Sequence, residues 1–201
     1  KVNHIAKHLE PLLRNSIEEH KKLAEGTNAL QWIKEAPYLY LYKSQQDYLN
    51  DSFIWNIRKN YGFNLIEVQS DELHELVPGL SKEYTFAIKI ENQGYILNSK
   101  NYLKDLLEGF KELGGNIIEE EVIDIISNKK NIKIKTNNNE IISDDVVIAA
   151  GVFSDTLSKK FGATVPLQSE RGYHLELRKT NIELKYPLFN GYLKLAIAPK
   201  P

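Results

Sequence analysis

The segment from Asp145 to Gly151 constrains the fold of this chain more than any other. Its sequence, Asp-Val-Val-Ile-Ala-Ala-Gly, is an apolar run without alternation, which is typical of a strand covered on both faces of a parallel sheet. Gly151 can turn the chain, and Ser154 or Asp155 can cap a following helix. The pattern therefore predicts a buried strand ending at Ala150, followed by a strand-to-helix turn at the edge of an α/β sheet.

The residues before this segment predict a helix and a meander. Residues 100–113 have helical periodicity, and Gly114-Gly115 can end the helix. We expect its apolar face to pack on the same sheet, and that face consists of Leu103, Leu106, Leu107 and Phe110. A strand is expected from Asn116, and alternating residues separated by polar turns predict three short antiparallel strands between Val122 and Ile142.

The first hundred residues read as a separate, more irregular α+β layer. Apolar residues at helical spacing predict one helix between Leu9 and Leu23, and Ser44 can cap a helix that ends near Gly62. The predicted strands in this layer are Tyr38–Tyr42, Leu65–Val68 and an edge or half-buried strand over Tyr84–Glu91. The tyrosines at 38, 40 and 42 are more typical of core packing than of a substrate cage.

Composition excludes several classes of protein. The 26 basic and 27 acidic side chains give a formal net charge of -1, which argues against a nucleic acid or an anionic membrane as partner. The chain has no cysteine, so it has no disulfide and no thiolate metal site, and we expect a cytoplasmic protein. We predict no membrane span.

His4 and His8 are four residues apart, but no third ligand follows them at useful spacing, so no metal site is predicted. The absence of methionine and the start at Lys1 predict a processed chain or an internal segment of a longer protein.

Two motifs resemble a known family. The first is the strand that ends in Ala149-Ala150-Gly151, with Phe153-Ser154 after it, and the second is Pro166-x-x-x-x-Arg171-Gly172-Tyr173. Together with the meander, in this order, they resemble the D-amino-acid oxidase/dehydrogenase superfamily of FAD-dependent oxidoreductases. The resemblance is strongest to the bacterial D-amino-acid dehydrogenases and is most distinct from Gly94 to Leu177.

The resemblance implies a fold and a division of the chain. The fold is α/β (α+β), with part of a flavin-binding sheet and its three-stranded meander beside an antiparallel-sheet substrate layer. Residues 1–97 would form the helical start and part of the substrate domain, and residues 98–164 part of the FAD-binding domain. Residues 165–201 would return into the substrate domain. No glycine-rich phosphate loop is present, so the resemblance makes this chain a central segment of such an enzyme.

The resemblance also implies cofactor-binding residues. Val122 matches the position whose backbone contacts the adenine end of FAD, and Ala149, Ala150 and Gly151 match the turn beside the cofactor. Small residues at such a turn allow a planar cofactor to approach the backbone closely. The alternative is that this tripeptide is only a tight strand-to-helix turn.

Arg171 and Tyr173 are the candidate substrate-binding residues. A guanidinium group presents two parallel donors to a carboxylate, and a tyrosine hydroxyl can help to fix it. We expect a strand here, in which these two residues share one face and His174 points away. The structural alternative is that Arg171 pairs with Glu170 or with another carboxylate.

As the resemblance implies, the full-length protein would transfer hydride from a D-amino acid or a similar small amino acid to flavin. Flavin-dependent oxidases of the sarcosine or glycine type, and 2-hydroxyacid dehydrogenases, are the alternatives within the superfamily. The alternative of another class is a non-catalytic α/β binding or assembly module. The sequence leaves the oligomeric state, the electron acceptor and the catalytic residues open.

Overall fold

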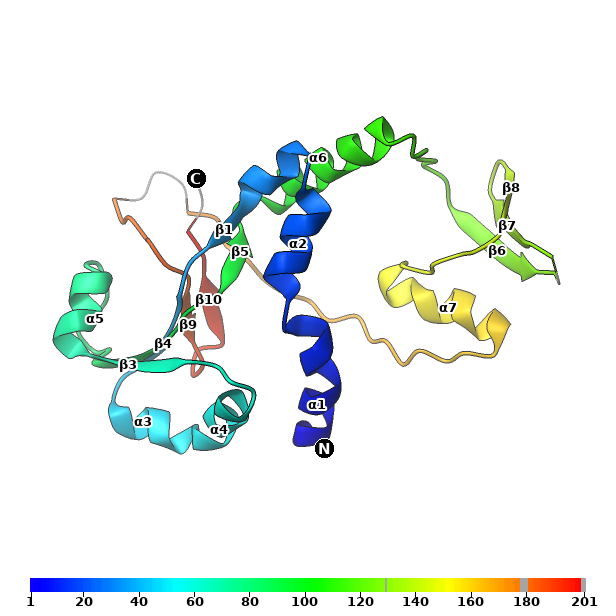
Figure 1. The fold of residues 1–201 in the computed structure, drawn as a ribbon. Helices are drawn as coiled ribbons and strands as arrows, with labels where there is room; N and C mark the ends of the chain where they lie inside the picture. Colours follow the sequence, from blue (N-terminus) through cyan, green and yellow to red (C-terminus); the bar gives the residue numbers. More distant parts are fainter. Residues whose placement is uncertain (129, 178–180, 200–201) are drawn as a thin grey trace. The chain divides into compact units, whose positions relative to one another are not determined.

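The computed structural model describes residues 1–128, 130–177 and 181–199 (Figure 1). The chain divides into two compact units, one of residues 1–115 and 179–201 and the other of residues 116–178. The first unit is therefore built from two separated stretches of chain, and the second unit is inserted between them. The assignment of residues 1–97, 98–164 and 165–201 to substrate and FAD-binding domains stays a prediction.

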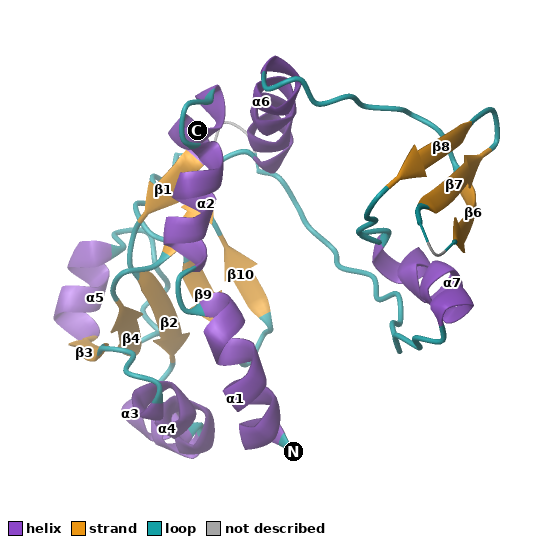
Figure 2. Ribbon diagram, turned by 45° about the vertical axis from the view of Figure 1, so that its right-hand side comes forward, coloured by secondary structure: helices purple, strands orange, loops and turns teal. Residues whose placement is uncertain are grey.

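A five-stranded sheet forms the centre of the first unit (Figure 2). Its strand order is β10-β9-β2-β4-β3, in which β2 and β9 run parallel and the other neighbours run antiparallel. The strands are β2 (Tyr38–Tyr42), β3 (Leu65–Gln69), β4 (Phe86–Ile90), β9 (Leu188–Asn190) and β10 (Leu195–Ile197). The predicted strands over 38–42 and 65–68 are confirmed.

The sheet is covered on both faces because β2 alternates between two kinds of apolar side chain. Leu39 and Leu41 are buried in a cluster with Leu73 of α5 (Ser70–Leu76). Tyr40 and Tyr42 point the other way and pack around Trp55, which is 2% exposed and belongs to α4 (Ser52–Asn60). The short helix α3 (Gln45–Asn50) precedes α4, and Ser44 caps it by accepting the backbone N–H of Asp47.

Strand β4 is not the edge or half-buried strand that alternation suggested. It pairs with β2 on one side and with β3 on the other, and Phe86, Ala87, Ile88 and Ile90 are all buried. Lys89 made the sequence look alternating and so suggested one exposed face. The apolar run Phe-Ala-Ile before it is typical of a strand that is covered on both faces.

The first predicted helix of the first unit differs from the observed structure. The segment expected as a single helix is split into α1 (Val2–Leu13) and α2 (Ser16–Ala24). A 3₁₀ helix, η1 (Asn28–Trp32), follows and leads into β1 (Ile33–Glu35), which pairs with β5 (Gly94–Ile96).

Helix α6 (Ser99–Glu112) confirms the predicted helix but not its predicted packing face. Leu103, Leu107 and Phe110 are 64%, 45% and 50% exposed, and only Leu106 is partly buried. The buried residues are instead Tyr102, whose hydroxyl lies 2.8 Å from His20 Nδ1 of α2, and Gly109, which lies against Thr27 at the start of η1. The helix packs against Thr27 at Gly109, because a residue without a side chain allows Thr27 to approach the helix backbone closely.

The second unit contains the predicted three-stranded antiparallel meander. Its strands are β6 (Val122–Ser127), β7 (Ile132–Thr136) and β8 (Glu140–Ser143) in the order β6-β7-β8. The separate strand expected from Asn116 before the meander does not form, because residues 116–121 have no strand structure and β6, the first meander strand, begins at Val122. After the meander come the 3₁₀ helix η2 (Gly151–Phe153), helix α7 (Ser154–Ser158) and the 3₁₀ helix η3 (Lys159–Phe161).

The prediction of a buried strand over Asp145–Ala150 is wrong for this structure. The segment has no strand partner among the described residues, and Val147 is 88% exposed. Val146 and Ile148 are only half-buried. A strand needs a neighbour that pairs its N–H and C=O groups, and the described meander is complete without this segment. The apolar segment 145–150 therefore has the composition of a strand but pairs with no strand among the described residues of this unit.

Candidate functional site

The predicted cofactor-binding residues all lie in the second unit. Val122 is the first residue of β6, is 38% exposed and pairs with Thr136 of β7. Ala149 and Ala150 are exposed at the end of the unpaired apolar segment. These three residues are therefore accessible to solvent, and their role in FAD binding stays a prediction.

The turn at Gly151 has a conformation that favours glycine. Its φ angle is 56°, in the left-handed region, and a Cβ added there would meet no atom within 4 Å. The backbone N–H of Ala150 donates to Ser154 Oγ at 3.1 Å, and the N–H of Phe153 donates to the Ala150 carbonyl oxygen. The turn is thus held from within, and the space beside its glycine is open, as it is at the other left-handed glycines of the described residues.

An ion pair joins the turn's helix to the meander. Lys160 of η3 pairs with Asp124 of β6, and its ammonium group lowers the pKa of that carboxyl. Asp155 accepts the backbone N–H of Val165 at 3.0 Å and pairs with Lys159 at 2.5 Å. These contacts fix the helix after Gly151 to the strand that begins at Val122.

Arg171 and Tyr173 lie in an exposed segment without strand pairing, and Tyr173 is 91% exposed. The strand expected here is absent from the described residues, so the argument that the two share one face no longer applies. The alternative that Arg171 is a structural ion pair also finds no support, because no carboxylate pairs with it in the described part of the chain. Substrate binding by Arg171 and Tyr173 stays a prediction.

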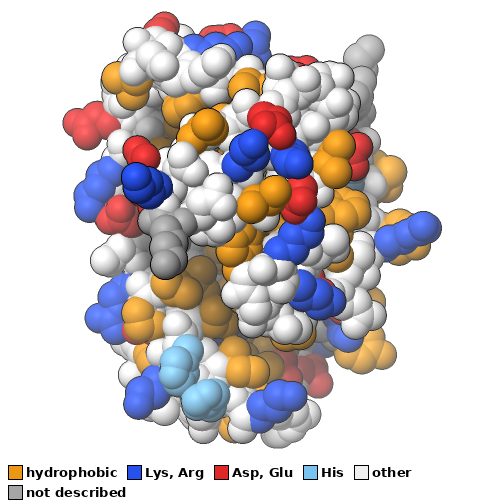
Figure 3. Space-filling model, turned by 90° about the vertical axis from the view of Figure 1, so that its right-hand side faces the viewer, with side chains coloured by type: hydrophobic (Ala, Val, Ile, Leu, Met, Phe, Trp, Pro, Cys, Tyr) orange, Lys and Arg blue, Asp and Glu red, His pale blue; other side chains and the backbone are white. Residues whose placement is uncertain are grey.

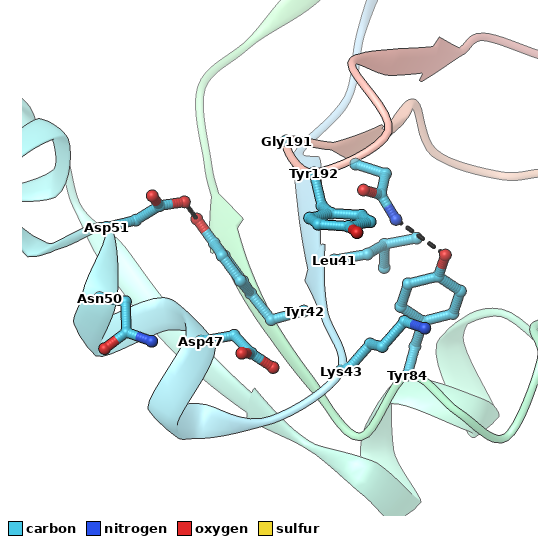
Figure 4. A pocket seen from close by; sticks show the side chains of 10 residues that line it. Leu41, Tyr42, Lys43, Asp47, Asn50, Asp51, Tyr84, Gly191 and Tyr192 are labelled. Atoms are coloured by element: carbon cyan, nitrogen blue, oxygen red, sulfur yellow. Dashed lines mark hydrogen bonds between the residues drawn. The ribbon is translucent and has the colours of Figure 1, made fainter.

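The sequence did not indicate a polar pocket that the structure shows in the first unit (Figure 4). Its volume is about 460 Å³, and it lies where β2 ends, beside α3 and the turn between β9 and β10. Its lining consists of Leu41, Tyr42, Lys43, Asp47, Asn50, Asp51, Tyr84, Asn190, Gly191 and Tyr192. Residues from three distant parts of the sequence meet there, so no local motif could have revealed it.

Hydrogen bonds fix several side chains of this pocket. Tyr42 donates its hydroxyl to Asp51 Oδ2 at 2.9 Å and accepts the indole N–H of Trp55 at 2.8 Å. On the other side, buried Asn190 donates its side-chain N–H to the Tyr84 hydroxyl at 2.8 Å and accepts the backbone N–H of Leu193. Both phenols are therefore held at fixed positions.

The charges of the pocket are mixed. Lys43 pairs with Glu83 at 2.7 Å, and Asp47 accepts the hydroxyl of Ser44 at 2.7 Å. Burial, with Asp51 as neighbour, raises the pKa of the Tyr42 phenol well above its ordinary value. Tyr42 is therefore a protonated donor at every physiological pH, and the pocket can hold polar and charged groups of a ligand.

The lining of the pocket has no histidine. Within the described residues there is also no group of three or more His, Asp or Glu side chains that could bind a metal ion. His8 Nδ1 lies 2.8 Å from the carbonyl oxygen of His4, in keeping with two neighbouring residues of one helix.

The surface matches the balanced charge of the sequence. On the face in Figure 3, Lys and Arg side chains lie among Asp and Glu side chains, with hydrophobic ones between them. In the part of the chain that the structure describes, no helix has the length and apolar character needed to cross a membrane.

Comparison with known proteins gives consistent results. The family model for FAD dependent oxidoreductases, DAO, matches residues 3–197. A D-amino-acid oxidase of Bradyrhizobium diazoefficiens is 29% identical over 168 residues, which cover 83% of this chain and 40% of that protein.

Two solved structures are similar in fold. The glycine oxidase of Bacillus cereus has a TM-score of 0.67 and 20% identity, covering 98% of this chain and 53% of that one. The L-α-glycerophosphate oxidase of Mycoplasma pneumoniae, solved with FAD bound, has a TM-score of 0.62 and 14% identity, covering 88% of this chain and 49% of that one. This chain thus spans about half the length of these two structures and 40% of the length of the curated relative.

Proposed function

Because the chain belongs to the family of FAD-dependent oxidoreductases, we propose that the protein containing it oxidises an amino acid with FAD as cofactor. The observation that carries the proposal is the extent of the family match, which runs through both units from residue 3 to residue 197. A match over one motif would have left a non-catalytic module open, whereas this one includes the meander, the glycine turn and the sheet.

FAD, when bound, supplies the redox chemistry by accepting hydride from the α C–H bond of the substrate. The residues of this chain would bind and orient. Val122 would offer backbone to the adenine end, and the turn of Ala149, Ala150 and Gly151 would lie against the cofactor.

A D-amino acid is the substrate class that we favour. The support is the 29% identical relative, which is a D-amino-acid oxidase, together with the motif containing Arg171 and Tyr173. Those two residues would fix the substrate carboxylate. Small achiral amino acids are a second candidate substrate class, because a glycine oxidase has a similar fold. Hydroxylated substrates are a third, because a glycerophosphate oxidase also has a similar fold.

The polar pocket of the first unit is a second candidate for substrate binding. It combines the ammonium group of Lys43 with the carboxylates of Asp47 and Asp51, which complement the two charges of an amino acid. Substitution separates the two candidates: Arg171→Lys and Asp51→Asn should each raise KM only if that residue contacts the substrate. We also propose that the protein acts in the cytoplasm.

The test is the absorbance spectrum of the purified full-length protein, followed by anaerobic addition of substrates. We expect flavin bands that bleach with D-alanine or another D-amino acid and not with the matching L-amino acid. Glycine, sarcosine and D-lactate form the comparison panel. A colourless protein, or flavin that no member of the panel reduces, would refute the proposal.

A further inference from the structure

A second pocket, of about 440 Å³, lies between α1, the start of α2 and the end of α4, within the first unit. Leu9 and Leu13 of α1, Ile17 of α2 and Phe63 after α4 form apolar walls. The pocket contains four charged side chains, and in the described part of the chain one of them forms no ion pair.

That residue is Arg58, in the last turn of α4. Its guanidinium carbon lies 4.5 Å from the ring centroid of Trp55 and 4.9 Å from that of Tyr40. Trp55 is almost completely buried, and Tyr40 stacks on Phe189 with the ring centroids 4.9 Å apart. The rings thus hold the cation in place and leave its N–H donors, which lie in its plane, to point elsewhere.

The remaining charges of the pocket are already paired. Glu10 pairs with Arg14 one helical turn away, and Glu91 lies 3.6 Å from Lys89. In contrast, Arg58 has no ion pair and no side-chain hydrogen bond within residues 1–128, 130–177 and 181–199. Among the described residues, the pocket therefore has one arginine without an ion pair, beside an apolar wall.

We propose that this pocket binds a small apolar monocarboxylic acid, with Arg58 as the group that binds its carboxylate. A carboxylate accepts two parallel N–H bonds from a guanidinium group, and the apolar part of the acid would displace water from the leucine and phenylalanine side chains. An uncharged acceptor such as a hydroxyl would give the Arg58 donors a weaker, single hydrogen bond in place of the charge-assisted pair. A cationic ligand would meet a like charge. The charge and the walls together therefore select an apolar anion.

The experiment is isothermal titration calorimetry of the full-length protein with 3-phenylpropionate, and with 3-phenylpropan-1-ol as the uncharged match. The carboxylate should bind with saturable heat, and the alcohol about 10- to 100-fold more weakly, as expected for loss of a charge-assisted hydrogen-bonded pair. Arg58→Gln should weaken the carboxylate by a similar factor. The double variant Glu10→Gln/Arg14→Gln removes a pair from the same pocket without changing its net charge, and should bind as the wild type does.

A second variant, at an exposed residue of the pocket wall, keeps the proposal testable if Arg58→Gln fails to fold. Leu13 is 60% exposed, so Leu13→Asp should fold and should weaken binding through its negative charge and lost apolar contact. Equal binding of acid and alcohol, unchanged binding by Arg58→Gln, or no saturable heat with the wild type would overturn the proposal. Calorimetry needs no turnover, so this result is separate from the outcome for the flavin chemistry.

Discussion

The close contact between Gly109 and Thr27 makes a stability prediction whose sign opposes helix propensity. A Cβ on residue 109 would lie 2.5 Å from Thr27 Cγ2 and 3.3 Å from Thr27 Cβ. Thr27 cannot rotate away without loss, because its hydroxyl donates to the Ala24 carbonyl at 2.8 Å and accepts the Ala29 N–H at 3.1 Å. The substitution Gly109→Ala therefore forces α6 away from η1.

The magnitude follows from two opposing contributions. Alanine in a helix interior is favoured over glycine by about 0.5–1 kcal/mol, whereas overpacking by one methyl group costs about 1–3 kcal/mol. Because the neighbouring threonine is held by two hydrogen bonds, we expect overpacking to win, with a net loss of about 1–2 kcal/mol.

The assay is urea unfolding of the purified protein, with thermal unfolding beside it. The control is the double variant Gly109→Ala/Thr27→Ser, in which the interfering methyl group is gone and the hydroxyl remains. It should regain most of the lost stability, so that the two substitutions are not additive. An increase in stability for Gly109→Ala alone would show that the helices do not approach as described.

Four further predictions concern the core, the ion pair, the cofactor and the substrate. Trp55→Phe should cost about 1–3 kcal/mol, because it removes the hydrogen bond to the Tyr42 hydroxyl and leaves a cavity, and urea unfolding measures it. Lys160 lowers the pKa of Asp124 below its ordinary 3.8, so this pair stabilises the second unit above that pH and its contribution is lost as the pH falls through the folded-state value. Lys160→Gln should accordingly flatten the dependence of Tm on pH below about pH 4, and an unchanged profile would argue against the pair. The full-length protein should purify with FAD and the isolated 201 residues without it, since they contain no glycine-rich phosphate loop; stoichiometric flavin on the isolated chain would contradict this. Arg171→Lys in the full-length protein should keep FAD but raise KM for D-amino acids, because lysine lacks the planar pair of donors, and steady-state kinetics would show it.

The features that sequence predicted correctly are the ones set by local patterns. Alternation and polar turns define the meander between Val122 and Ile142, and helical spacing with a flanking Gly114 defines α6. The resemblance in two motifs anticipated the family that the whole chain matches.

The features that it missed depend on partners distant in the sequence. Residues 145–150 have the composition of a covered strand, but composition supplies no neighbour to pair with. The packing face of α6 was misjudged because size, rather than hydrophobicity, decides the contact at Gly109. The polar pocket combines Tyr42, Tyr84 and Asn190, whose meeting is a property of the sheet order alone.

The parallel pairing of β2 with β9 has a consequence during synthesis on the ribosome. One edge of β2 is completed only by residues 188–190, and residues 43–187 must be translated first. At ~5–20 residues per second, that interval lasts roughly 7–29 s. During this time the open edge beside Leu39 and Leu41 is exposed to strand pairing with other nascent chains. The order of translation therefore leaves this edge of β2 unpaired until residues 188–190 have been made, and the sheet of the first unit cannot be completed before then.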